Sequence, residues 1–279
     1  MKIWVVGPIA WDSVLFLENS FSDSGYTHVK KKSERPGGQG LNVSSGLKSA
    51  NLDVQLVGYL GNDANAEKLE NSIRALGLST DFIAKIKVST PHIMVLVDNK
   101  GERKMIGLEE SYFSDVRLPV DQILESDVVV WTWWREDFTE DFKKCKAIGA
   151  KTIVGLAALN NPEIDADLFV GSSQEVGNAK LHDDRKVIVT NGAEGATFHH
   201  QGKSIYESAN NVEVIDTTGA GDAFLSGVTY GVAHNFEIEE CMRIGVNWSS
   251  ASISSESSLP ANWSEKYLEK NTHKIYRIS

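Results

Sequence analysis

Cysteine is scarce in this sequence, and its scarcity argues against two kinds of site. Only Cys145 and Cys241 occur in 279 residues, and the chain contains no C-x-x-C pair. Neither a disulfide framework nor a zinc site is therefore indicated, and this cysteine usage fits a reducing compartment such as the cytoplasm.

Long apolar runs are also missing. No apolar stretch approaches the roughly 20 residues needed to span a bilayer, so we expect no association with a membrane. The opening residues, MKIWVVG, enter a strand-like run at once and lack the apolar region and cleavage site of a secretory signal. On these grounds we expect a cytoplasmic protein.

Basic residues are outnumbered by acidic ones. Lysine and arginine total 28 against 38 aspartates and glutamates, which gives a formal net charge of −10. A general nucleic-acid binder needs a basic face to displace counterions, so we expect no nucleic-acid partner. The charge does not exclude an anionic small molecule, because a local group of backbone N–H donors can offset the global field.

What is present is the composition of a globular protein. Hydrophobic residues make up 41% of the chain and charged residues 24%. The length alone is compatible with one domain or two. Since no internal repeat or low-complexity linker divides the sequence, we predict a single domain over residues 1–279.

Strand-like and helix-like segments alternate along the chain. Buried strands are predicted at residues 2–6, 54–59, 128–134, 151–156, 168–171 and 187–190, with a β pair at 197–200 and 204–207. Helices are predicted at 42–50, 64–76, 140–148, 222–234, 237–254 and 264–270. Apolar strands separated by helices are typical of a mostly parallel sheet covered on both faces, so we predict a three-layer α/β/α core.

Two other regions interrupt this alternation. Residues 13–17 and 26–32 have partly polar alternation, and residues 92–97 and 104–107 flank Asp98-Asn99-Lys100-Gly101, a strong hairpin signal. We predict that segments of about 13–34 and 88–109 form a small antiparallel lid outside the main sheet. Such a lid would cover a ligand at the carboxyl ends of the strands and exclude water.

A glycine-rich turn stands out near the C-terminal end. We predict that Val214 and Ile215 end a strand, that residues 219–221 form a turn, and that Asp222 begins an apolar helix. A strand, a glycine turn and a helix N-terminus in this order form an anion site. Asp222 then has two interpretations: an acid that suits the helix dipole, or a base beside a bound phosphate.

Four motifs carry a resemblance to a known family. DTTGAGDAF at 216–224 and RPGGQGLNVS at 35–44 resemble the two signatures of the ribokinase-like (PfkB) carbohydrate kinases. GYLGND at 58–63 and VTNGAEGA at 189–196 resemble further family segments, in the same order. The resemblance implies a ribokinase-like α/β/α fold with a β lid and a kinase that uses ATP and Mg²⁺. It also implies a possible homodimer through the lid.

The resemblance also implies residue roles. Asp222 matches the catalytic base, and the anion hole would be Gly219, Ala220 and Gly221. Matches to substrate-binding positions are Asp12, Gly38, Gln39 and Asn42, and matches to nucleotide-binding positions are Thr190, Gly192, Gly195 and Asn247. Glu175 matches an acid that acts on Mg²⁺ through water, and Asp216 and Thr218 match positions that hold a monovalent cation, such as K⁺, in many relatives.

Two positions depart from the family pattern. Gln39 stands where ribokinases usually have lysine, which leaves ribose itself in question as a substrate. Ser172 replaces the asparagine of the N-x-x-E motif that ends at Glu175, so the arrangement around a metal would differ.

Several alternatives stay open from the residues alone. Asp12, Glu175 and Asp216 could be a loop acid, a helix-start acid and a turn acid, and Asn247 a polar residue on a helix face. The first hypothesis is an ATP-dependent kinase that phosphorylates a primary hydroxyl of a small sugar or sugar derivative. The alternatives are a nucleoside kinase, in which the WTWW run at 131–134 or Tyr112-Phe113 stacks on a base, and a non-catalytic sugar-binding relative. Core packing is the competing interpretation of the WTWW run.

Overall fold

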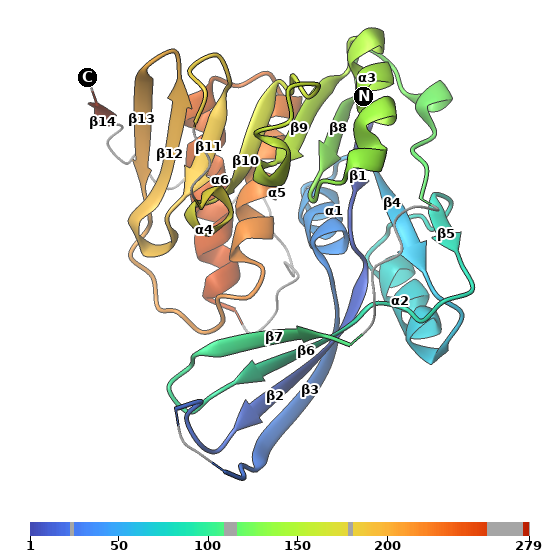
Figure 1. Ribbon diagram of the computed structural model, residues 1–279, viewed down its shortest axis with the longest axis vertical. Coiled ribbons are helices and arrows are strands. Elements are labelled where there is room, and N and C mark those ends of the chain that lie inside the picture. The colour runs from blue at the N-terminus through green and yellow to red at the C-terminus, as the bar shows by residue number, and fades with distance from the viewer. Residues whose placement is uncertain (23–24, 109–115, 178–180, 256–275, 279) are drawn as a thin grey trace.

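The computed structural model describes residues 1–22, 25–108, 116–177, 181–255 and 276–278. Over these residues the chain forms a ten-stranded sheet, helices on both of its faces, and a separate four-stranded sheet (Figure 1). The strands of the large sheet are β1 Ile3–Val6, β4 Val54–Leu60, β5 Ile83–Lys85, β8 Val128–Trp131, β9 Lys151–Gly155, β10 Leu168–Ser172, β11 Val187–Thr190, β12 Gly195–His200, β13 Lys203–Ser208 and β14 Tyr276–Ile278.

The large sheet is mostly parallel, as predicted. Its spatial order is β14-β13-β12-β11-β10-β9-β8-β1-β4-β5, and every neighbouring pair from β11 to β5 is parallel. Strands β12, β13 and β14 add an antiparallel edge. The central strands β1 and β8 are buried along their whole length, which explains why they read as continuous apolar runs.

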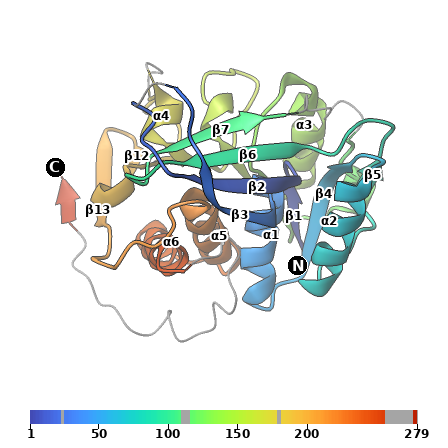
Figure 2. The same cartoon turned by 90° about the horizontal axis from the view of Figure 1, so that it is seen from below.

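Helices cover both faces of this sheet. Side chains alternate along β1, so that Ile3 and Val5 join one core and Trp4 and Val6 join the other. The first core lies beneath α1 Gln39–Ser49, α2 Ala64–Ala75, α5 Ala220–Ala233 and α6 Ile238–Ile253, and the second beneath α3 Thr139–Ile148 and α4 Ser173–Val176. Figure 2 shows these two helix layers on opposite sides, which confirms the three-layer prediction.

The smaller sheet is the lid. It consists of β2 Ala10–Leu17, β3 Val29–Gly37, β6 His92–Val97 and β7 Arg103–Gly107, in the order β3-β2-β6-β7. The expectation of a purely antiparallel lid was wrong, because β2 and β6 pair in parallel. Strands β2 and β6 run in the same direction, and each pairs with an antiparallel partner, β3 and β7 respectively. The two hairpins therefore meet along the parallel strands β2 and β6.

Other expectations differ from the structure or fall outside it. The predicted strand end at Val214 and Ile215 is wrong: β13 ends at Ser208, and neither residue belongs to a strand. Both residues are more than half exposed. Instead, the backbone N–H groups of Ile215 and Asp216 donate to the carbonyl of Ile253. The predicted helix at 264–270 and the Tyr112-Phe113 pair lie outside the described residues.

The WTWW run belongs to the core rather than to a ligand-stacking surface. Strand β8 ends at Trp131, earlier than the predicted end at residue 134, and Trp131 and Trp134 are buried against each other and against Phe142. Short 3₁₀ helices occur at η2 Val120–Gln122, η3 Glu136–Phe138, η4 Leu156–Ala158 and η5 Gly192–Glu194. Within the part of the chain that is described, no helix has both the length and the apolar character needed to cross a membrane.

The connection order places a ligand site at the end of β1. The chain passes from β1 to β4 on one side of the sheet and later continues at β8 on the other side of β1. Such a reversal leaves a crevice at the carboxyl ends of the parallel strands. The lid begins at this same point, since β2 follows β1 after only residues 7–9.

Candidate active site

Asp12 lies near the start of β2, close to the core, where it pairs in register with Arg35 of β3. Its side chain is buried, with 7% of its surface exposed. A Cβ atom on the neighbouring Gly37 would lie 2.2 Å from a carboxylate oxygen of Asp12, so only glycine leaves room for this acid. The sequence order strand–turn–acid therefore places Asp12 in the crevice at the end of β1.

The glycine pair ahead of α1 shapes the next part of the site. Gly38 has a φ of 92°, and a Cβ there would lie 2.5 Å from the carbonyl oxygen of Pro8. This conformation and this close approach require glycine. Gly38 is the N-cap of α1, and Asn42 follows one turn later, with its backbone N–H donating to the carbonyl of Gly38 at 2.9 Å. Gln39 is exposed at the first position of the helix.

Helix α5 supplies the helix end that the sequence predicts to bind an anion. Gly219, its N-cap, adopts the left-handed conformation with a φ of 82°, and Ala220 and Gly221 open the helix. The first N–H groups of an α-helix have no partner within the helix, and here they coincide with the positive end of the helix dipole. Apart from its chain neighbours and the backbone of α5 itself, no atom of the described residues lies within 4 Å of the position that a Cβ on Gly221 would take, so this end has room for a ligand.

Asn42 and Asp222 join the two helix ends. The side-chain amide nitrogen of Asn42 donates to a carboxylate oxygen of Asp222 at 2.7 Å, although the two residues are 180 positions apart. The other amide atom of Asn42, Oδ1, is buried and has no hydrogen-bond partner among the described residues. The bond holds Asp222 in one orientation beside the open end of α5.

The pKa values of Asp12 and Asp222 are both raised. Burial raises the pKa of Asp222 to about 6, against the hydrogen bond from Asn42, which lowers it, and the charge of Glu175 raises it further. Burial also raises the pKa of Asp12 to about 6, with Arg35 opposing and the charge of Asp222 adding to the rise. The charge of Asp222 thus acts on Asp12, and both carboxylates are ionised at neutral pH, when each can accept a hydrogen bond from a hydroxyl.

Glu175 and Ser172 form a capping box at the start of α4. The Ser172 hydroxyl donates to Oε1 of Glu175 at 2.9 Å, and the Ser172 backbone N–H donates to the same oxygen at 3.3 Å. These contacts are those expected of an acid at the start of a helix, which was one of the two interpretations of Glu175. Its second oxygen takes no part in the box and makes no hydrogen bond among the described residues, and the side chain is exposed.

Asp216 is held by two arginines. Arg35 Nη1 lies 3.0 Å from one of its oxygens, and Arg103 Nη2 lies 2.7 Å from the other. The backbone N–H of Thr218 also donates to Asp216 at 2.7 Å, which is the contact expected of a turn acid. Burial alone would raise the pKa of Asp216, but the hydrogen bonds from Thr218 and Arg35 outweigh it and hold that pKa below its ordinary value.

The residues matched to nucleotide binding lie toward the antiparallel edge of the sheet. Thr190 ends β11, beside Ser172 in the neighbouring parallel strand, and its hydroxyl donates to the carbonyl of Gly171 at 3.3 Å. Gly192 begins η5, the short helix that leads to β12, and Gly195 is the first residue of that strand. A Cβ at Gly195 would lie 2.1 Å from a backbone oxygen, so a side chain cannot fit there.

Asn247 is buried within α6, and its side-chain oxygen accepts from Asn210 at 2.9 Å. This contact ties the irregular segment after β13 to the helix, which matches the helix-face interpretation.

Sequence reasoning missed the two arginines that hold Asp216. Arg35 was visible only as part of a glycine-rich motif, and Arg103 carried no motif signal at all. The register of β2 and β3 places Arg35 opposite Asp12. The contact of Arg103 with the turn at 216–218 depends instead on the position of the lid over the core. Local patterns do not contain that information.

Comparison with known proteins agrees with the geometry. A family model described as pfkB family carbohydrate kinase matches residues 2–132 and 134–264. The ATP-dependent ribose-1-phosphate kinase of Halopiger xanaduensis is 24% identical over 249 residues, which cover 81% of this chain and 83% of that protein. The ribokinase of Bacillus subtilis is 23% identical over 239 residues, which cover 79% and 82%.

Solved structures show the same fold. The ribokinase of Thermotoga maritima superposes with a TM-score of 0.79 at 19% identity, covering 96% of this chain and 98% of that one. A nucleoside kinase of Burkholderia thailandensis, solved with inosine, superposes with a TM-score of 0.78 at 18% identity, covering 96% and 95%. The ribokinase-like fold is thereby confirmed, and the match of the family model over most of the sequence shows that this chain belongs to the pfkB family of carbohydrate kinases, ATP-dependent phosphotransferases that act on an alcohol group.

Proposed function

We propose that this protein transfers the γ-phosphate of ATP to a primary hydroxyl of a small carbohydrate or sugar derivative, with Asp222 as the general base. The observation that carries the proposal is the hydrogen bond between Asn42 and Asp222. It places an oriented carboxylate between the glycine turn that would bind the acceptor and the helix end that would bind the phosphate.

Asp222 acts on the acceptor hydroxyl. It takes the hydroxyl proton while the hydroxyl oxygen forms a bond to the γ-phosphorus, and the bond to the bridging oxygen breaks so that ADP leaves with the electron pair. The N–H groups of Gly219, Ala220 and Gly221 at the end of α5 stabilise the charge on the transferred group. Asp12, Gly38, Gln39 and Asn42 surround the acceptor and orient its hydroxyl toward Asp222.

The metal ion would bind together with ATP. The described residues contain no group of three or more histidines, cysteines, aspartates or glutamates placed to hold a metal ion. Mg²⁺ is commonly held by substrate phosphates and waters with one or two carboxylates, and the free oxygen of Glu175 fits that role. When bound with ATP, Mg²⁺ neutralises charge on the phosphates.

The nucleotide would extend from α5 toward the antiparallel edge of the sheet. Thr190, Gly192 and Gly195 form one wall, and Asn247 lies on the helix side. The close backbone approach at Gly195 leaves this wall without side chains that would block a ring. The buried Trp131 and Trp134 remove one of the arguments for a nucleoside acceptor, because neither presents a face for a base to stack on.

We also propose that the protein forms a homodimer through the lid. The lid strands expose apolar side chains, among them Val29, Met105 and Ile106, whose exposed fractions are 46%, 64% and 45%. A second lid would cover them. Analytical ultracentrifugation that finds only monomer at micromolar concentration would contradict this proposal.

The test of the kinase proposal is ATP turnover with a panel of neutral and phosphorylated sugars, with nucleosides as an additional set. The Asp222→Asn variant should lose about 10²–10⁴-fold in kcat, the contribution of a positioned general base. Asp81→Asn, at an exposed loop position, is the matched control and should retain full activity. Equal rates for wild type and Asp222→Asn would exclude Asp222 as the base.

A further inference from the structure

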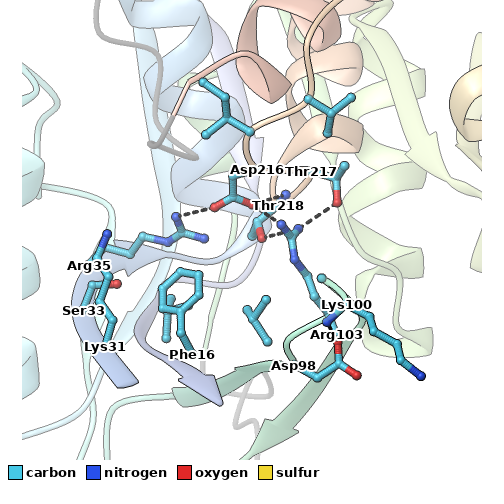
Figure 3. Close-up of a pocket in the computed structure, with 15 residues that line it drawn as sticks. Phe16, Lys31, Ser33, Arg35, Asp98, Lys100, Arg103, Asp216, Thr217 and Thr218 are labelled. Atoms are coloured by element: carbon cyan, nitrogen blue, oxygen red, sulfur yellow. Dashed lines mark hydrogen bonds and ion pairs between the residues drawn. The ribbon is translucent and has the colours of Figure 1, made fainter. Parts of the chain in front are cut away.

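A cavity of about 740 Å³ lies between the lid and the segment that precedes α5. Its walls are β2, β3 and the β6–β7 hairpin on the lid side, and residues 214–218 on the core side (Figure 3). We call it the lid pocket. None of the residues matched to the nucleotide, Thr190, Gly192, Gly195 and Asn247, lines it.

The lid pocket continues the face on which Asp12 lies. Side chains alternate along a strand, so Val14 and Phe16, two and four residues beyond Asp12 on β2, project to the same side as Asp12. Their partners on β3, Ser33 and Lys31, also line the pocket. A ligand held at Asp12 therefore has open space along this face, toward Ser33 and Lys31.

The lining is basic in a protein whose net charge is −10. Lys31, Arg35, Lys100 and Arg103 line the pocket, against the two carboxylates of Asp98 and Asp216. Both carboxylates are already engaged. Asp98 accepts from the backbone N–H groups of residues 21, 100 and 102, and Asp216 accepts from the two arginines and Thr218.

The cationic groups have more donors than these acids can satisfy. Figure 3 shows Arg35 and Arg103 approaching Asp216 from opposite sides. Arg35 Nε and Nη2 and Arg103 Nε are buried without any acceptor among the described residues. Among the described residues, no carboxylate pairs with Lys31, and its Nζ lies 5.5 Å from the centre of the Phe16 ring. Buried donors without acceptors are uncommon in folded proteins and require an explanation.

We propose that the acceptor sugar carries an anionic group, a phosphate monoester or a carboxylate, and that this group binds in the lid pocket. Lys31 and the two arginines bind the anion, Ser33 and Thr217 supply hydroxyl donors, and the hydroxyl to be phosphorylated faces Asp222. The inference rests on the proposed kinase function and names its substrate class. It explains both the surplus of donors and the continuity of the pocket with Asp12.

Kinetics with matched acceptors test the substrate class. The pairs are ribose with ribose 1-phosphate, fructose with fructose 1-phosphate, and glucose with gluconate. We expect kcat/KM for the anionic member of at least one pair to exceed that of its neutral partner by roughly 10- to 100-fold, the effect of one or two charge-assisted hydrogen bonds. Equal or higher values for every neutral member would overturn the inference while leaving the kinase function intact.

Two adjacent lysines provide matched variants. Lys31 lines the pocket, whereas Lys32 projects to the other side of β3 and pairs with Glu34 at 2.9 Å. Lys31→Met should raise KM for the anionic acceptor by about tenfold, and Lys32→Met should leave it unchanged. A rise in the KM for ATP in place of the KM for the acceptor would assign the pocket to the γ-phosphate and overturn the inference.

A binding measurement separates this inference from the kinase proposal. Calorimetric titration of the wild type with ribose 1-phosphate, fructose 1-phosphate and gluconate needs no ATP and no turnover. Binding of one of them that Lys31→Met weakens and Lys32→Met does not would support the anion site even if no acceptor were phosphorylated. Absence of binding by all three would overturn it.

Discussion

Arg103 and Asp216 form an ion pair of 2.7 Å that connects the lid to the core. Arg103 begins β7 in the lid, and Asp216 begins the DTTGAGD segment that leads into α5. The same guanidinium also donates to the hydroxyls of Thr217 and Thr218 at 2.7 and 2.8 Å. The lid is thus attached to the segment that precedes the N-terminal end of α5.

Loss of this attachment should loosen the lid. We expect Arg103→Gln to raise KM for the acceptor about tenfold and to increase the ATP hydrolysed to water per sugar phosphorylated, because a closed lid excludes water from the site. ADP formation and sugar-phosphate formation, measured in the same reaction, give this ratio. Arg74→Gln, which removes an exposed pair with Glu70, is the control. An unchanged ratio in Arg103→Gln would contradict the role of the pair.

The reaction should require the ionised form of Asp222. Because the pKa of Asp222 is raised from 3.8 to about 6, the carboxylate takes up a proton as pH falls through this value and can no longer act as a base. We expect kcat/KM to fall by about tenfold per pH unit below pH 6. Asp12, with a pKa also near 6, adds to the same decline.

Asn42 provides the variant for this pH profile. Its hydrogen bond lowers the pKa of Asp222, so Asn42→Leu should move the acidic limb to higher pH. Ser45→Ala, on the same helix, is the control. A limb that stays in place in Asn42→Leu would show that Asp222 is not the group that titrates.

Gly221 should matter for phosphate binding and not for folding. Beyond its chain neighbours and the backbone of α5, a Cβ there meets no atom of the described residues within 4 Å, so Gly221→Ala should leave the melting temperature nearly unchanged. The added methyl group would enter the space above the open N–H groups of α5, and we expect kcat/KM for ATP to fall at least about tenfold. Calorimetry and steady-state kinetics on the same sample measure both effects.

Gly219 provides the comparison, because a substitution there should change stability as well as activity. Gly219 has a φ of 82°, which an alanine adopts only with strain, so Gly219→Ala should lower both stability and activity. A Gly221→Ala protein with wild-type activity would show that the phosphate does not approach this position.

Glu207 should make the protein less stable as pH rises. The side chain is 3% exposed, and burial raises its pKa from 4.5 to about 7, with Arg243 opposing and Glu240 adding to the rise. Below pH 4.5 the folded and unfolded states are both protonated at this residue. Between pH 4.5 and 7 the unfolded chain releases the proton and the folded protein keeps it, so the free energy of unfolding falls, by on the order of 1–3 kcal/mol.

The Glu207→Gln variant should lack this decline. At pH 8 it should be more stable than the wild type, as measured by urea unfolding. Glu213→Gln, at an exposed position in the following segment, should match the wild type at every pH. A wild-type pH dependence retained in Glu207→Gln would place the titrating group elsewhere.

The protein should not need K⁺. The resemblance suggests a monovalent cation at Asp216 and Thr218, but two guanidinium groups already neutralise Asp216. We therefore expect the same kcat in KCl and in tetramethylammonium chloride at equal ionic strength. Activation by K⁺ of about tenfold or more would show that the arginines move aside for a cation.

Sequence patterns predicted the larger elements well where the signal is local. The apolar runs of β1 and β8 and the helix that begins at Ala220 depend on periodicity and on glycine turns, which neighbouring residues determine. Asp222 could be named as a base because its motif lies within nine consecutive residues. The strand end predicted at Val214 and Ile215 was wrong, since these apolar residues have the pattern of a strand but are exposed and belong to no strand.

The sequence by itself therefore determined the order of strands and helices, the glycine turns and the acid at the start of α5, because these depend on residues close together in the chain. Only the tertiary structure decided that Asn42 orients Asp222, that Arg103 reaches Asp216 and that a basic pocket continues from Asp12. Those contacts join residues more than 100 positions apart. They exist because the strand order of the parallel sheet and the register of the lid bring distant strand and helix ends to one edge.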